Sequence, residues 1–361
     1  MNAAITSKKA RNLLDPLKDT KVPGIQYVVM DADRVIFDYA EGWADIRNHK
    51  PMLSGTTQMA YSMTKTFTAA AILQLVEKGK LKLEDKLHLY LPDHPYDQNI
   101  TIRHLLTHTS GIPNPIPLRW AHLVEMHEAF DEKAALAQVL RANPRTSFEP
   151  GRRYAYSNIG YWLLGQVIED VTQQSYIAYM RENVLKPLRT DGYEMDFIIA
   201  DPSHHAKGYL ARYSMMNLVK GLVTDRIMWG PYEGKWLHLN SHYVNGPAFG
   251  GLLGPGRGFG RFLQDQLKVQ SVLLSQEIQQ LFYTQQKNSL GEAIEMTLGW
   301  HVGEIQGVRY YFKEGGGGGF HSEMRLYPTK RLASVVMVNS TQFNSNAFLS
   351  NFDKSFWDQG F

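Results

Sequence analysis

The pattern of hydrophobic and polar positions predicts strands near both ends of the chain and helices between them. Near the N-terminus, β-branched and aromatic residues fill two runs, Ile25–Met30 and Arg34–Tyr39, with the turn residues Asp31–Asp33 between them. Two such runs joined by a short polar turn predict a β-hairpin. The charged segment before them predicts a short opening helix over Lys9–Lys18.

From residue 64 to about residue 284 the apolar spacing favours helices, and strand patterns are sparse. Thr64–Lys78 is rich in Ala, Leu, Gln and Glu, which predicts a buried amphipathic helix that ends at Gly79. Further helices are predicted over these ranges: Ile102–Leu106, Glu132–Arg141, Ile159–Val171 and Gly258–Val269.

Strand patterns return near the C-terminus and are followed by a last helix over Asn346–Trp357. Short turns between the runs favour an antiparallel meander. The predicted strands are Leu298–Glu304, Val308–Lys313, Glu323–Tyr327 and Leu332–Val338. We therefore expect an α/β (α+β) fold, with one antiparallel sheet built from both termini and flanked by helices. Residues 1–80 and 285–361 would form the sheet domain, and residues 81–284 a mostly helical inserted domain.

Composition narrows the possible partners and cofactors. The chain has 361 residues, 43% of them hydrophobic, and 38 Lys+Arg against 35 Asp+Glu leave a net charge of only +3. This small surplus predicts no nucleic-acid partner. Because the chain has no cysteine, disulfides, thiolate catalysis and Cys-based metal sites are excluded. Met1–Gly24 lacks the apolar core of a signal peptide and no apolar run approaches ~20 residues. We therefore expect a cytoplasmic protein without a membrane span, or a periplasmic or secreted one if a leader was removed.

The most informative pair of residues is Ser62 and Lys65, at the predicted start of the first long helix. Residues three apart lie on one face of a helix, so the amine can reach the hydroxyl. A serine hydroxyl becomes a good nucleophile only when a neighbouring base takes its proton. A Ser at a helix start is more often only a cap, and Lys a surface charge. No other Ser in the chain has Lys three residues later, and the flanking residues are those of a buried helix.

Two further segments carry candidate chemistry. Tyr156-Ser157-Asn158 follows a Pro-Gly turn and precedes an apolar helix, where Ser157 or Asn158 could serve simply as a helix cap. Lys313-Glu314-Gly315 ends a predicted strand and leads into a run of five glycines, Gly315–Gly319. Glycines at a strand edge let a substrate approach closely, and their N–H groups can stabilise an oxyanion. The alternative is a flexible glycine turn.

In this order and spacing, the three segments resemble the serine β-lactamase and penicillin-binding-protein superfamily, and in particular its class C-like branch. That branch contains class C β-lactamases, D-alanyl-D-alanine carboxypeptidases and family VIII carboxylesterases. The resemblance covers nearly the whole chain and includes two further stretches, Ile100–Ile112 and Gly250-Gly251-Leu252. It implies a β-lactamase-like fold with the active site between the two domains.

The resemblance also implies a role for each residue. Ser62 would be the acylated nucleophile, Lys65 its general base, and Tyr156 the group that relays the proton to the leaving group and activates water. Asn158 would hold the substrate or the Lys65 amine, and Lys313 would place positive charge near Tyr156. The oxyanion would bind the N–H of Ser62 and that of Gly315 or Gly316.

Glu314 departs from the family pattern, which usually has Thr or Ser at this position to bind a substrate carboxylate. An acid there is expected to repel carboxylates, so we expect uncharged esters to be preferred over β-lactams. The predicted function is therefore a serine hydrolase of small carboxylic esters, like the family VIII carboxylesterases, with weak β-lactamase activity possible. The alternatives are a β-lactamase, a D-alanyl-D-alanine carboxypeptidase or aminopeptidase-type peptidase, and a non-catalytic binding module of the same fold. The oligomeric state stays open.

No cofactor or metal is expected. The pairs His104/His108 and His238/His242 have helical spacing, but neither has the Glu of a zinc-binding His-Glu-x-x-His motif. Structural hydrogen bonding is the preferred interpretation of both pairs. The segment Tyr213–Leu239 is rich in Met and aromatic residues, which indicates packing of the helical domain or, alternatively, an apolar substrate pocket near Ser62.

Overall fold

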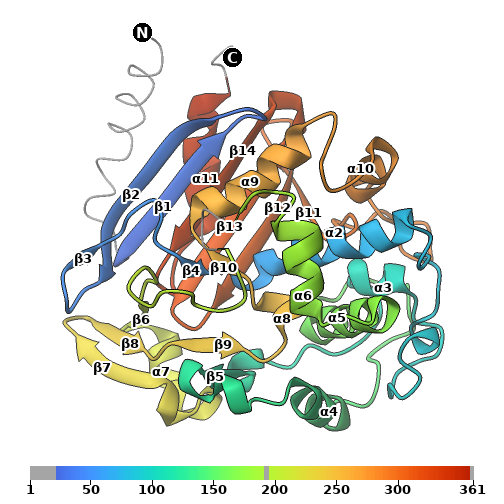
Figure 1. Cartoon of the computed structure of the whole chain (residues 1–361), viewed down its shortest axis with the longest axis horizontal. Helices are drawn as coiled ribbons and strands as arrows, with labels where there is room; N and C mark the ends of the chain where they lie inside the picture. Colours follow the sequence, from blue (N-terminus) through green and yellow to red (C-terminus); the bar gives the residue numbers. More distant parts are fainter. Residues whose placement is uncertain (1–21, 191–194, 358–361) are drawn as a thin grey trace.

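A seven-stranded antiparallel sheet organises the protein (Figure 1). The computed structural model describes residues 22–190 and 195–357, so the predicted helix Lys9–Lys18 lies outside the described residues. The sheet order is β11-β12-β13-β14-β1-β2-β3, which joins strands from both ends of the chain as expected. Its strands are β1 (Gly24–Met30), β2 (Val35–Asp45), β3 (Lys50–Pro51), β11 (His301–Ile305), β12 (Val308–Gly317), β13 (Phe320–Tyr327) and β14 (Leu332–Val338).

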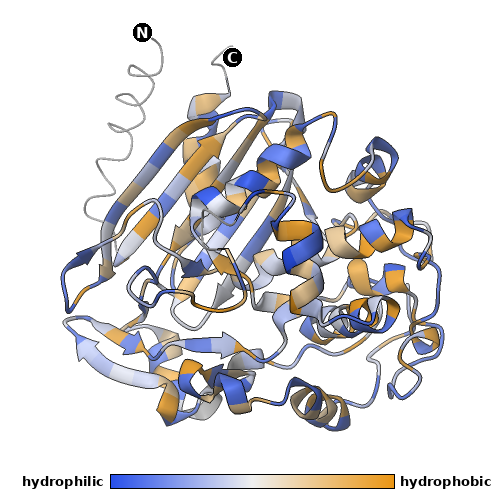
Figure 2. Cartoon of the chain, in the orientation of Figure 1, coloured by the Kyte–Doolittle hydropathy of each residue, from blue (hydrophilic) through white to orange (hydrophobic). Residues whose placement is uncertain are grey.

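Both faces of this sheet are covered, because its central strands carry apolar residues on both sides. On one face, Ile25, Tyr27 and Val29 pack in a cluster with Phe348 of α11 (Ser345–Phe352). On the other face, Val28 and Met30 belong to the main core together with the residues of α9 (Gly256–Leu267). Figure 1 shows α9 on the near side of the sheet and α11 behind it, and Figure 2 shows the apolar colouring of the strands between them.

Helix α2 (Thr64–Glu77) runs through the centre of the main core and matches the predicted helix. It is buried on nearly every side rather than amphipathic, because other helices pack around it. The other helices in the middle of the chain, apart from α7 (Met215–Val223) and α9, are α3 (Ile102–Leu106), α4 (Glu132–Ala142), α5 (Asn158–Thr172), α6 (Tyr176–Met180), α8 (Pro247–Gly250) and α10 (Gln276–Tyr283). No helix in the described ranges is both long and apolar enough to cross a bilayer.

The middle of the chain also contains strands that the sequence pattern did not indicate. A small sheet of order β6-β8-β7 lies below the main sheet in Figure 1, next to α7 (Met215–Val223). These strands have at most five residues, too few for a clear alternation. They are β6 (Gly208–Ala211), β7 (Trp229–Glu233) and β8 (Trp236–Leu239), and two further pairs join β5 (Ala121–Leu123) to β9 (His242–Val244) and β4 (Gln58–Met59) to β10 (Leu253–Gly254).

Helix α9 lies within the segment predicted as the helical domain, yet it packs on β1, β13 and β14 of the main sheet. The division of the chain into residues 1–80 with 285–361 and residues 81–284 therefore stays a prediction. The candidate site lies where α2, α5 and β12 meet.

Strand β12 continues past its expected end at Lys313 as far as Gly317. Its neighbour β11 pairs with it only up to Phe312, opposite His301. From Lys313 to Gly317, β12 pairs with β13 on one side, and among the described strands none pairs with its other edge. This part of the strand can therefore present backbone groups to the turn that carries Ser62.

Candidate active site

Ser62 lies in a 3₁₀ turn, Tyr61–Met63, immediately before α2. The N-cap of α2 is Met63, with no side-chain cap, so capping does not explain the serine. The Ser62 hydroxyl oxygen instead lies 3.0 Å from Lys65 Nζ and 2.7 Å from the Tyr156 hydroxyl. Two groups that can carry a proton, an amine and a phenol, therefore meet at the Ser62 oxygen.

The Lys65 amine is fully buried and is held by three oxygen atoms. Besides Ser62, Nζ donates to Asn158 Oδ1 at 2.7 Å and to the carbonyl of Phe249 at 2.6 Å. Burial, followed by the nearby charge of Lys313, lowers the pKa of Lys65 well below its usual value. A neutral amine has two N–H bonds, and Asn158 and Phe249 can accept a hydrogen bond from each of them. Its lone pair can then accept the proton of the Ser62 hydroxyl.

Tyr156 donates its hydroxyl proton to Ser62, and Lys313 Nζ lies 5.2 Å from the centre of its ring. Lys313 is fully buried, and within the described part of the chain its Nζ has no hydrogen-bond partner. Burial lowers the pKa of Lys313 to about 7. Burial also raises the pKa of the Tyr156 phenol. The surroundings therefore favour a neutral phenol as proton carrier, rather than the phenolate that a strong effect of Lys313 would produce.

Asn158 occupies the first turn of α5, and Ser157, not Asn158, is the N-cap, accepting from the N–H of Gly160. This leaves the Asn158 amide free to turn toward Lys65. Its Nδ2 donates to Asn114 Oδ1 at 3.1 Å, which orients Oδ1 toward the amine.

The first glycines of the run Gly315–Gly319 are explained by close contacts with the turn that carries Ser62. A Cβ on Gly315 would collide with the carbonyl oxygen of Ala60 and lie 3.0 Å from the backbone nitrogen of Ser62. A Cβ on Gly317 would lie 2.5 Å from the Tyr61 ring. Gly316 lies between them and lines the same cavity as Ser62. The glycine run is therefore a strand edge pressed against the Ser62 turn, not a flexible loop.

Glu314 lies beside these residues but does not line that cavity. It is opposite Glu323 in the register of β12 and β13, and its carboxylate pairs with His321 Nε2 at 2.8 Å. The hydrogen bond from His321 is the main reason that the pKa of Glu314 is lowered. This pairing holds the carboxylate against His321 and outside the cavity, so its charge acts on a substrate only from a distance. The physical basis for expecting uncharged substrates is therefore weaker than the sequence indicated.

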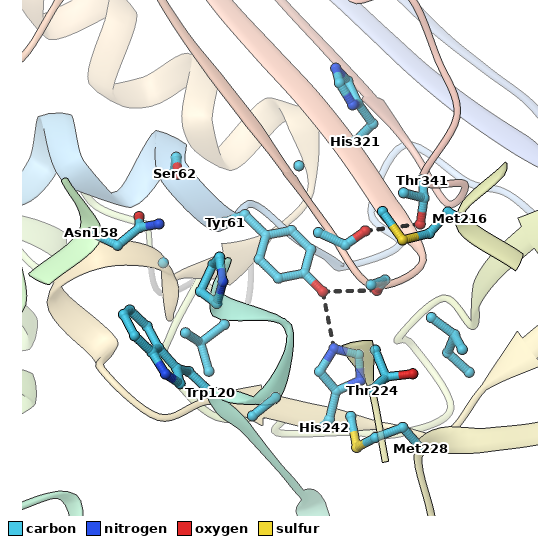
Figure 3. A pocket seen from close by; sticks show the side chains of 18 of the residues that line it. Tyr61, Ser62, Trp120, Asn158, Met216, Thr224, Met228, His242, His321 and Thr341 are labelled. Atoms are coloured by element: carbon cyan, nitrogen blue, oxygen red, sulfur yellow. Dashed lines mark hydrogen bonds between the residues drawn. The ribbon is translucent and has the colours of Figure 1, made fainter. Parts of the chain in front are cut away.

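A cavity of about 350 Å³ extends from Ser62 between β12 and α7 (Figure 3). This volume falls at the lower end of the range for small-molecule sites. Met216, Met228 and Leu239 confirm that the Met-rich segment contributes to a pocket, while Trp236 from the same segment is buried in packing. The apolar lining is formed by Pro117, Trp120, Ala121, Leu210, Met216, Met228, Leu239, Val244 and Phe249.

Comparison with known proteins assigns the family. The family model described as Beta-lactamase matches residues 10–352. The chain belongs to the beta-lactamase family. This confirms the expected superfamily and the expected fold, and members of this family are serine hydrolases.

Two curated relatives match part of the chain. Penicillin-binding protein 4* of Bacillus subtilis is 31% identical over 179 residues, which is 49% of this chain and 39% of that protein. Protein flp of Staphylococcus aureus is 32% identical over 199 residues, 54% of this chain and 39% of that protein. The matched region thus spans about two fifths of the length of these relatives.

Solved structures share the fold over nearly the whole chain. An octameric penicillin-binding protein homologue from Pyrococcus abyssi has a TM-score of 0.77 and 23% identity, covering 97% of this chain and 76% of that one. The D-amino acid amidase of Ochrobactrum anthropi has a TM-score of 0.78 and 18% identity, covering 98% of both chains. At these identities the likeness establishes the fold of this family member.

Sequence reasoning missed Tyr61 and its partner His242. Tyr61 adopts a left-handed backbone, with φ of 47°, directly before Ser62. Its hydroxyl lies 2.8 Å from the carbonyl oxygen of Gly318 and 3.0 Å from His242 Nε2, as the dashed lines of Figure 3 show. Non-Gly residues with positive φ are uncommon and are often found at functional sites. Tyr61 thus links the Ser62 turn to the glycine strand.

His104, His108 and His242 have structural partners, whereas His238 Nε2 has no hydrogen-bond partner among the described residues. His104 Nδ1 accepts from the N–H of Thr101 in a capping box, and His108 Nδ1 accepts from the N–H of Ser157. The His108 ring also packs on Tyr156, with ring centres 4.3 Å apart. No group of three or more potential metal ligands occurs among the residues that the structure describes.

Proposed function

We propose that this beta-lactamase family member hydrolyses carboxylic esters through an acyl-enzyme on Ser62. The observation that carries the proposal is the convergence of Lys65 Nζ and the Tyr156 hydroxyl on Ser62 Oγ, at 3.0 and 2.7 Å. A non-catalytic module of the same fold would have no need to keep these groups together with a buried, unpaired Lys313.

In the first step, the neutral Lys65 amine takes the proton of Ser62 as Oγ forms a bond to the ester carbonyl carbon. The negative charge on the carbonyl oxygen is stabilised by the N–H groups of Ser62 and Gly316, both of which line the cavity. Gly315 is the less suitable donor, because it is not among the cavity-lining residues. The bond to the alcohol then breaks, and the alcohol leaves with a proton from Lys65, passed through the Tyr156 hydroxyl.

In the second step, water attacks the acyl carbon and gives its proton back through Tyr156 to Lys65. The bond to Ser62 Oγ breaks, Oγ regains a proton, and the carboxylic acid leaves. One ester and one water thus yield one acid and one alcohol, and the enzyme is restored. Lys313 contributes positive charge beside Tyr156, and Asn158 holds the Lys65 amine in place.

The choice of esters over β-lactams or peptides rests on the lining of the cavity. The cavity next to Ser62 is mostly apolar, which suits an acyl chain. Similarity to penicillin-binding proteins and to a D-amino acid amidase keeps lactams, D-peptides and amides as the substrates to be compared.

The test is a comparison of kcat/KM for p-nitrophenyl butyrate, a chromogenic cephalosporin, a D-alanyl-D-alanine peptide and a D-amino acid amide. We expect the ester to be preferred, and Ser62→Ala and Lys65→Ala each to remove most of its turnover. Because nucleophile and base act as a unit, the double variant should be little worse than either single one. A preference for the cephalosporin, peptide or amide would contradict the ester proposal, and near-native turnover of Ser62→Ala would contradict the nucleophile.

A further inference from the structure

One face of helix α7 forms the part of the cavity across Tyr61 from Ser62. Met216, Lys220 and Thr224 follow one another at intervals of four residues and all line the cavity. In Figure 3, Met216 and Thr224 lie on the opposite side of the Tyr61 ring from Ser62. Lys220, between them on the helix, therefore contributes to the distal end of the cavity.

The Lys220 ammonium is oriented by its neighbours. Its Nζ donates to Asn217 Oδ1 at 2.6 Å and to the Asn217 carbonyl at 3.1 Å. Asn217 is buried and is itself fixed by hydrogen bonds to the backbone of Ala211 and Arg212. The ammonium also lies 5.1 Å from the centre of the Trp229 ring. Its position is thus set before any ligand arrives, which lowers the entropy cost of binding one.

The Lys220 charge is not neutralised by an acid. No Asp or Glu lines the cavity, and no carboxylate of the described residues lies within ion-pair distance of Lys220 Nζ. The other titratable side chains of the lining already have hydrogen-bond partners in the protein. His321 pairs with Glu314, and His242 forms a hydrogen bond with Tyr61. An apolar cavity with an unneutralised cation at one end is complementary to an apolar chain with an anion at its end.

We propose that Lys220 binds a negatively charged group at the far end of the substrate's acyl chain. The preferred substrates would be esters of dicarboxylic acids, or of other acids that carry a terminal anion. This inference rests on the proposed esterase function and specifies its substrate class. The acyl half is the one assigned to the cavity, because it stays bonded to Ser62 between the two steps while the alcohol leaves.

The experiment compares matched esters that differ only at the end of the acyl chain. The p-nitrophenyl monoesters of six-, eight- and ten-carbon dicarboxylic acids are each paired with the neutral ester of the same chain length. For the best-fitting length, we expect Lys220→Met to lower kcat/KM for the charged ester about ten- to a hundred-fold, the range for a hydrogen bond to a charged group. The neutral ester should change by less than about two-fold, because the methionine keeps the apolar contact with Trp229.

Lys235→Met is the matched control. Lys235 also lies over a tryptophan, with Nζ 5.6 Å from the Trp236 ring, but it does not line the cavity. Its loss should leave the ratio of charged to neutral turnover unchanged, whereas Lys220→Glu should lower that ratio further than Lys220→Met. Higher ionic strength should reduce the preference of the wild type.

The outcomes separate the two proposals. If the wild type hydrolyses both esters and Lys220→Met leaves their ratio unchanged at every chain length, the Lys220 inference is wrong and the esterase proposal stands. If Lys235→Met lowers the ratio of charged to neutral turnover as much as Lys220→Met does, the effect comes from the overall charge of the protein. In that case too, the Lys220 inference is wrong. If the wild type hydrolyses no ester of either series, the esterase proposal itself fails.

Discussion

Replacing Lys313 by methionine removes one of two buried amines beside Tyr156 and tests which group acts as the base. Lys65 Nζ lies 5.0 Å and Lys313 Nζ 5.2 Å from the centre of the Tyr156 ring. The two nitrogen atoms are therefore no more than about 10.2 Å apart, the sum of these distances. Repulsion from Lys313 lowers the pKa of Lys65, second in effect to burial.

This upper limit on the separation sets a lower limit on the size of the effect. At an effective dielectric constant of about 20, two unit charges ~10 Å apart repel by about 1.6 kcal/mol, which corresponds to about 1.2 pKa units. Without Lys313, the protonated form of Lys65 loses that repulsion, so its pKa rises. Because the proposed mechanism needs the neutral amine, the rising limb of the pH profile of kcat/KM should move to higher pH by at least about one unit.

The assay measures kcat/KM for a neutral p-nitrophenyl ester across pH in the wild type, Lys313→Met and Tyr156→Phe. If Lys65 is the base, Tyr156→Phe should lower the rate but retain the rising limb. Lys186→Met, which removes an exposed lysine paired with Glu182, should leave the profile in place. If the rising limb of the pH profile is unchanged or moves to lower pH in Lys313→Met, the coupling of the two lysines is refuted. A limb that disappears in Tyr156→Phe would identify the phenol as the base.

Three further substitutions test the surroundings of Ser62. Tyr61→Phe removes the bonds to Gly318 and His242, so kcat for the neutral ester should fall about ten-fold with little change in KM; a change in KM alone would contradict a positioning role. Gly317→Ala should lower stability by about 1–3 kcal/mol in denaturant unfolding because its Cβ meets the Tyr61 ring, and Tyr61→Ala in the same chain should recover part of that loss. Glu314→Thr should change the ester-to-cephalosporin ratio by less than about three-fold, since His321 already pairs with the carboxylate, and a larger change would restore Glu314 as the residue that sets substrate preference.

Much of the fold could be predicted because the longer elements carry their pattern locally. The terminal strands and α2 are long enough for period and burial to be read from neighbouring residues. The strands β6, β7 and β8 could not be predicted, because segments of four or five residues contain too few positions for an alternation. They are stabilised by pairing with each other and not by local preference.

The contacts of the candidate site also differ in how far they could be predicted from the sequence. Ser62 and Lys65 are three residues apart on one turn, so their contact could be expected from spacing alone. Tyr61 and His242 are 181 residues apart, and no local feature indicates that their side chains meet. The environment of Glu314 could not be predicted from the sequence either, because its pairing with His321 depends on the register of two strands. Residue type thus indicated which chemistry was possible, while long-range contacts decided which groups remained charged and accessible.

The central claim is that Ser62 forms a covalent acyl-enzyme, and intact-mass analysis after rapid acid quench tests it most directly. Incubation with p-nitrophenyl butyrate should add the mass of one butyryl group, and peptide mapping should place it on Ser62. Ser62→Ala should remain unmodified under the same conditions. Hydrolysis of the ester with no acyl group on Ser62 even at the shortest quench times, or an equal adduct on Ser62→Ala, would contradict the account.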